Sequence, residues 1–66
     1  MRLDEIAQHD GQYCKIETVT GEELFGRLTR LAHDSFGLVE PSDDRAIAWL
    51  YASEIASVQP TAPPRR

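Results

Sequence analysis

The chain lacks the devices that usually stabilise a very small domain. Its 66 residues form one domain, which buries roughly 60% of the surface that its unfolded chain exposes. A single cysteine, Cys14, excludes an intrachain disulfide. The only histidines, His9 and His33, have no zinc-ligand spacing, which argues against a structural zinc site. Because these two devices are missing, the composition favours self-association.

Positive charge and long apolar runs are also scarce. The chain has 7 basic and 11 acidic residues, a net charge of −4, and two of the basic residues are Arg65 and Arg66 at its end. The basic footprint typical of nucleic-acid binding is therefore missing. No apolar run approaches the roughly 18 residues of a membrane-spanning helix, and no secretory leader is visible. These absences, with the single thiol, predict a cytoplasmic location without a membrane partner.

The chain begins with a short helical pattern and then changes to strand periodicity. Leu3, Ile6 and Ala7 lie at helical spacing, which predicts a helix over residues 2–9 with Gly11 as a left-handed cap. From Tyr13 the apolar period becomes two, which predicts strands.

Five short strands with tight turns are predicted over residues 12–59, an arrangement typical of a small barrel or sandwich. In the second strand, "ELFGRLTRLA", Gly26 marks a bend or a close backbone approach. Leu31 is out of step with Leu28, which predicts a bulge near residues 29–30. Residues 61–66, rich in proline and arginine, are predicted to be a disordered tail after a domain of residues 1–60.

The predicted fourth strand, "AIAWLY", is apolar on both faces. Alternation places Ile47, Trp49 and Tyr51 on one face, and Leu50 with two alanines on the other. Because a small core covers only one face, the second face needs another partner. Packing is the favoured role for Trp49 and Tyr51, whereas Phe36, just after a turn, is the aromatic side chain expected to be partly exposed.

Three features of the sequence contain residue types that can carry out chemistry. His33–Ser35 contains the residue types of a catalytic triad, but consecutive side chains diverge, and a turn is favoured. Asp43 and Asp44 supply too few oxygen ligands for a hard cation. Cys14 is expected to be a buried, inert thiol. The sequence therefore predicts no enzyme activity, no metal and no cofactor.

Residues 11–60 resemble the Sm-like (LSm) family, most of all its bacterial Hfq host-factor branch of RNA chaperones. The segment "VTGEELFGRL" resembles the family's element of an apolar residue, two glycines and a leucine. "DSF" resembles the D-x-F turn, and "YASEIASVQP" resembles the closing Y-x-x-x-I-x-x-V-x-P. The segment between Leu28 and Asp34 is about two residues longer than is usual in the family.

The resemblance implies a mainly β fold, with the short helix followed by a strongly bent, five-stranded antiparallel SH3-like barrel. It also implies a homo-oligomeric ring in which the fourth strand of one subunit pairs with the fifth strand of the next. A hexamer is the first expectation, and rings of five or seven stay open. The expected interface residues are Ile47, Trp49, Leu50, Tyr51, Ile55 and Val58.

The resemblance further implies RNA binding, but three RNA surfaces of the Hfq branch have lost their cations here. A Lys-His pair after the closing tyrosine is replaced by Ala52 and Ser53. The surface for A-rich RNA has Glu17 and Glu23 at its matching positions. At the end of the helix, residues 8–10 replace an arginine cluster. The RNA-binding residues that remain as candidates are Arg27, Arg30, Asp34, Ser35, Phe36, Tyr51 and Ser53.

Two hypotheses of function follow. The first is an RNA-binding, Sm-like post-transcriptional regulator with divergent sites, in which Phe36 stacks a base and arginines hold phosphate. The second is a homo-oligomeric structural or protein-interaction scaffold that binds no RNA. Charge favours the second hypothesis, and the usual use of the fold favours the first.

Overall fold

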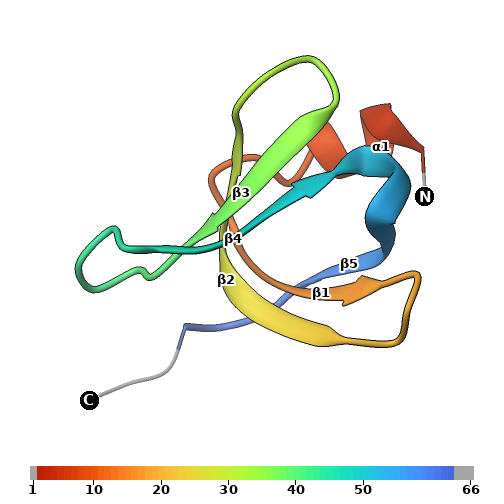
Figure 1. Ribbon diagram of the computed structural model, residues 1–66. Coiled ribbons are helices and arrows are strands. Elements are labelled where there is room, and N and C mark those ends of the chain that lie inside the picture. The colour runs from red at the N-terminus through yellow and green to blue at the C-terminus, as the bar shows by residue number, and fades with distance from the viewer. Residues whose placement is uncertain (1, 64–66) are drawn as a thin grey trace.

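The computed structural model describes residues 2–63 and has one short N-terminal helix followed by five strands (Figure 1). The mainly β fold predicted from the sequence is confirmed at this level. The elements are α1 (Leu3–Ala7), β1 (Tyr13–Thr18), β2 (Glu23–Arg30), β3 (Ser35–Val39), β4 (Ala46–Tyr51), the 3-10 helix η1 (Ala52–Glu54) and β5 (Ile55–Pro60). The sequence had not predicted η1, which separates the last two strands.

All five strands form one open antiparallel sheet in the order β4-β3-β2-β1-β5. Figure 1 shows that the sheet curls, so that β3 and β4 cross in front of β1 and β2. The order places β4 and β5, the last two strands along the chain, at opposite edges of the sheet.

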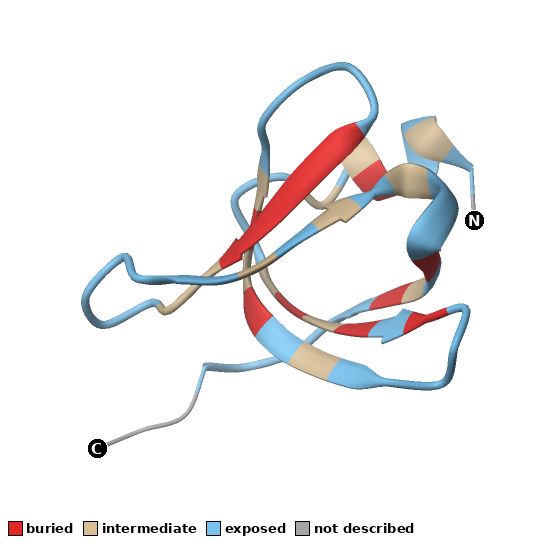
Figure 2. Cartoon of the chain, in the orientation of Figure 1, coloured by how far each residue is buried: buried red, intermediate tan, exposed pale blue. Residues whose placement is uncertain are grey.

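One hydrophobic core lies inside the curled sheet. Period-two alternation accounts for it, because every second residue of a strand faces the same side. Figure 2 shows buried residues along β1, β2, β3 and β5 and on α1. The buried apolar residues are Ile6, Cys14, Ile16, Leu28, Phe36, Leu38, Ile55 and Val58.

Helix α1 is shorter than the predicted span of residues 2–9. Its first turn is closed by the backbone N–H of Arg2, which donates to Oε1 of Glu5 at 3.2 Å. Ile6 is fully buried, so the helix docks on the core through this side chain. Gly11 has the predicted left-handed conformation, with φ +87°, but its N–H donates to the carbonyl of Leu28 at 2.7 Å. Gly11 therefore joins the helix to the sheet.

The close backbone approach predicted at Gly26 is confirmed. A Cβ at this position would lie 3.1 Å from Cδ1 of Ile47 and 3.2 Å from both Cβ of Leu38 and the carbonyl oxygen of Val39. Any side chain on residue 26 would therefore displace the neighbouring strands.

The bulge predicted near residues 29–30 is wrong. β2 pairs with β3 in continuous register from Arg27 to Arg30. Leu31 falls out of step because it follows the end of β2, and its side chain turns back over Gly37 of β3. The register shifts lie elsewhere, between Glu17 and Thr18 and between Leu38 and Val39.

The chain leaves the sheet after β5. The N–H of Thr61 still donates to the carbonyl of Tyr13 at 3.0 Å, and residues 62–63 are exposed without regular secondary structure. The rest of the predicted tail, residues 64–66, lies outside the described residues. No helix within residues 2–63 is long and apolar enough to cross a membrane.

Candidate functional site

The most unusual surface of the chain is the outer side of β4. Trp49 and Tyr51 expose 54% and 45% of their surfaces, so their predicted packing is not provided by the chain itself. Their side chains contact each other edge to face, with ring centroids 4.7 Å apart. Exposed apolar side chains that gather on one strand indicate an interaction surface.

Leu31 extends this surface across β3. Its Cδ1 lies 3.3 Å from the position that a Cβ on Gly37 would occupy, and Gly37 pairs directly with Trp49. Leu31 is itself 55% exposed. We call Leu31, Trp49 and Tyr51 the outer cluster. The alternation of residues along the sequence did not place Leu31 in this cluster, although a glycine in the facing strand could have indicated that a side chain lies over that strand.

Ile47 does not belong to the outer cluster. Strict alternation along β4 would place it beside Trp49, but the shift in register between Leu38 and Val39 interrupts the alternation opposite this residue. The Cδ1 atom of Ile47 lies over Gly26 of β2, and the side chain stays 42% exposed. The single apolar face predicted for Ile47, Trp49 and Tyr51 is therefore wrong at Ile47.

The other predicted interface residues lie within the chain's own core. Leu50 is half-buried and packs against the core, and Ile55 and Val58 are buried in it. Their side chains are thus used by the fold of one chain. The groups at the sheet edges that stay accessible to a second molecule are the backbone of β4 and β5 and the outer cluster.

The predicted base-stacking residue is inaccessible. Phe36 is 0% exposed, so the expectation of a partly exposed side chain is wrong. The physical reason is position: Phe36 is already within β3, pairs with Leu50 of β4 and points into the core. Ser35 is buried as well, whereas Asp34 and Ser53 are exposed. The D-x-F turn therefore presents only its aspartate to solvent.

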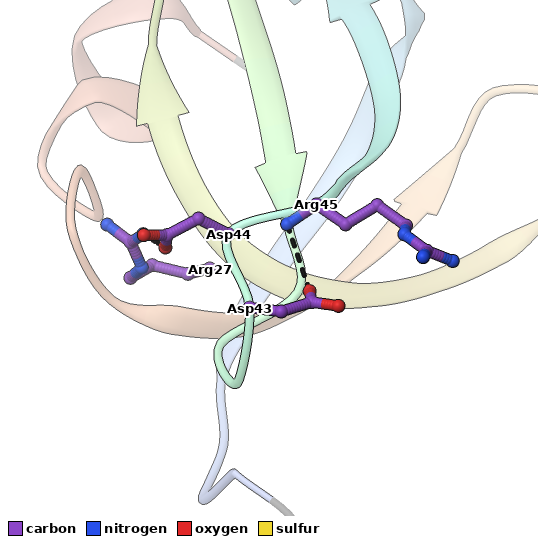
Figure 3. A network of polar contacts seen from close by, with 4 residues as sticks. All are labelled: Arg27, Asp43, Asp44 and Arg45. Atoms are coloured by element: carbon purple, nitrogen blue, oxygen red, sulfur yellow. Dashed lines mark hydrogen bonds and ion pairs between the residues drawn. The ribbon is translucent and has the colours of Figure 1, made fainter.

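The two candidate arginines of β2 already have partners. Nη2 of Arg27 lies 2.6 Å from Oδ1 of Asp44, a residue of the β3–β4 turn (Figure 3). The guanidinium of Arg30 donates to the carbonyls of Ala32 and His33 and lies 6.0 Å from the ring centroid of Phe36. A phosphate would have to compete with these contacts.

The turn that joins β3 and β4 holds a small polar network. The N–H of Arg45 donates to Oδ1 of Asp43 at 3.0 Å, and Asp44 has φ +58°. Figure 3 shows the guanidinium of Arg45 extended away from Asp43 and from the Arg27–Asp44 pair. Arg45 is the cation nearest in sequence to Trp49.

The remaining described cations lie on or before the first strand. Nζ of Lys15 is 3.0 Å from Oε2 of Glu23, and Nε of Arg2 is 3.6 Å from Oδ1 of Asp4. Because four of the five basic residues within residues 2–63 have polar partners, no concentrated basic patch forms over this part of the chain.

Neither the thiol nor the triad-like motif forms a reactive centre. Cys14 is buried, its Sγ donates to the carbonyl of Gln12 at 3.2 Å, and burial raises the pKa of the thiol. Ser35 is buried, whereas His33 and Asp34 are exposed. Among the described residues there is no cluster of His, Cys, Asp or Glu that could hold a metal ion, and the surface of this part has no pocket.

No protein-family model matches the chain, and no curated protein matches it.

Proposed function

We propose that this protein is a ring-forming, Sm-like oligomeric module whose copies join through β4 of one copy and β5 of the next. One observation carries the proposal: the two ends of a single sheet are open, and one of them bears the exposed outer cluster. Unpaired sheet edges are templates for pairing with another chain. A head-to-tail contact of this kind closes into a ring when its rotation permits.

Size supports the same proposal. A domain of this length is marginal alone, and a second copy would cover apolar surface that the chain leaves in water. The strongly bent SH3-like barrel and the hexameric ring remain part of the proposal, and both rest on the resemblance to Sm-like proteins.

We infer that the assembled ring serves as a scaffold for other proteins. Each copy contributes a net charge of −4, and a ring multiplies this charge, which disfavours contact with polyanions. The pairing of Arg27 with Asp44 and of Lys15 with Glu23 supports this choice, because it removes cations that a nucleic acid would need.

RNA binding is the second candidate, and the exposure of the outer cluster is the observation that favours it. Trp49 and Tyr51 are exposed aromatic side chains in contact with each other, and Arg45 immediately precedes the same strand. Single-strand binders combine stacking side chains with nearby cations. The two functions compete for one surface, because assembly through β4 would cover the side chains that stack bases.

Two measurements separate these candidates. Light scattering tests assembly: the ring predicts a multiple of the 7.4 kDa chain mass, and a 7.4 kDa species at micromolar concentration would refute it. Filter binding of U-rich and A-rich oligonucleotides at about 50 and about 200 mM salt tests the second candidate. Binding tighter than about 10 µM that weakens with salt would support RNA recognition. Its absence at low salt would eliminate that candidate.

A further inference from the structure

The backbone of β4 presents alternate residues to the open edge. The N–H of Ala52 donates to the carbonyl of Asp34 at 2.7 Å, in register with the β3–β4 ladder. In an antiparallel ladder, hydrogen-bonded and non-hydrogen-bonded residues alternate. Leu50 therefore directs its polar backbone groups toward β3, whereas Trp49 and Tyr51 direct theirs toward the open edge.

The same reasoning gives the open edge of β5. The N–H of Thr61 donates to the carbonyl of Tyr13 at 3.0 Å, in register with the β1–β5 ladder. Gln59 therefore faces β1, and Val58 and Pro60 direct their backbone groups away from the sheet.

Each open edge has one residue that cannot donate. On β4, the N–H of Tyr51 is already bonded to Oε1 of Glu54 at 2.8 Å. On β5, Pro60 has no N–H. Trp49 and Val58 are then the residues whose edge-facing N–H and carbonyl are both available for a regular ladder.

These blocked donors distinguish one register from its neighbours. When Trp49 lies opposite Val58, each N–H meets the carbonyl of the other residue. The two blocked donors, at Tyr51 and Pro60, then fall opposite Ala56 and Ile47, the residues that the strand pairing already skips at its register shifts. A shift that sets Trp49 opposite Pro60 also sets Tyr51 opposite Val58, and the carbonyls of Trp49 and Val58 then have no donor. The opposite shift sets Trp49 against Ala56, where the pairing of β5 with β1 already changes register.

The favoured register also places the outer cluster against the neighbour's core. Directly paired residues lie on the same face of a sheet. Val58 faces its own core and pairs with Ile16, which pairs in turn with the half-buried Leu24. Trp49 of one copy, with Leu31 beside it, would continue this apolar row across the boundary between copies.

We infer that Trp49 of one copy pairs with Val58 of the next and extends that neighbour's apolar row, which runs from Val58 through Ile16 to the half-buried Leu24. The inference rests on the proposed assembly through β4 and β5. It adds the register of the interface and names Trp49 as the side chain that crosses the boundary between copies. The register is fixed by Tyr51 and Pro60, which have no free backbone N–H at the open edges.

Disulfide cross-linking tests the register. With Trp49 opposite Val58, Ala48 and Gln59 form a non-hydrogen-bonded pair with Cα atoms about 4.5 Å apart, a separation that a disulfide spans. The Ala48→Cys/Gln59→Cys double variant should oxidise to a ladder of covalent oligomers on a non-reducing gel. Ala48→Cys/Thr61→Cys and Ala48→Cys/Ser57→Cys are matched controls for the two shifted registers and should stay uncrosslinked. The single variants control for links through Cys14.

The emission of Trp49, the only tryptophan in the chain, provides a measurement that needs no variant. Assembly should move its emission to shorter wavelength and reduce quenching by acrylamide. Covalent oligomers formed by either control pair would overturn the inference and leave the proposed assembly intact. The same conclusion would follow if acrylamide quenched Trp49 as readily in the assembled protein as in the dilute monomer. A wild-type chain that stays monomeric at micromolar concentration would overturn both.

Discussion

Replacing Trp49 with alanine should weaken self-association strongly and change the fold of the single chain little. Trp49 exposes 54% of its surface in the single chain. Because a large aromatic side chain covers up to about 250 Å², a neighbour could remove roughly 130 Å² more from water. At about 25 cal/mol per Å², this area is worth about 3 kcal/mol for each contact between copies. The dissociation constant of each contact should therefore rise by about a hundredfold or more.

Sedimentation equilibrium over a range of concentrations measures this change. Phe25→Ala is the matched control, because Phe25 is 48% exposed but lies on the outer side of β2, opposite Lys15 and away from both sheet edges. This control should assemble like the wild type. Equal assembly of the Trp49→Ala and wild-type chains, or equal weakening by both substitutions, would refute the reasoning. Circular dichroism at low concentration verifies that each variant is folded.

Three further predictions concern the single chain. Phe36→Ala should lower the free energy of unfolding in urea by about 3–5 kcal/mol, because it empties a fully buried site, and an unchanged midpoint would contradict its place in the core. Gly26→Ala should cost about 1–3 kcal/mol, because the new Cβ meets Ile47, and adding Ile47→Ala should restore part of the loss. Burial raises the pKa of Cys14 above its ordinary value of 9.0, so its contribution to stability is full below pH 9 and falls as the pH rises through the folded-state pKa. Urea unfolding at pH about 8 and about 10 should show this loss in the wild type, and Cys14→Ala should lack it.

The strand positions could be predicted because alternation is a local signal. Cys14 and Ile16 on β1 face the core, as the period of two from Tyr13 onward predicts. A close approach of another strand could be predicted at Gly26 because a glycine inside a strand often marks a place where another backbone comes near.

The candidate site was predicted less well, because accessibility depends on where a turn ends. Phe36 was expected to be partly exposed beside the turn, but β3 begins one residue earlier and carries it into the core. Arg27 was a candidate for phosphate, but the β3–β4 turn brings Asp44 to 2.6 Å from it across 17 residues of sequence. A contact of this kind has no signature in the local sequence.

The sequence by itself determined the helix, the five strands, most inward-facing residues and an apolar surplus on the fourth strand, because these follow from periodicity and composition. Only the tertiary structure decided which residues meet. Sheet order placed β4 and β5 at the two edges, and Leu31 turned back over Gly37 to join Trp49. A hydrogen bond from Tyr51 to Glu54 removed one donor from the edge of β4. These outcomes depend on chain segments that approach one another through folding, and spacing along the sequence does not encode them.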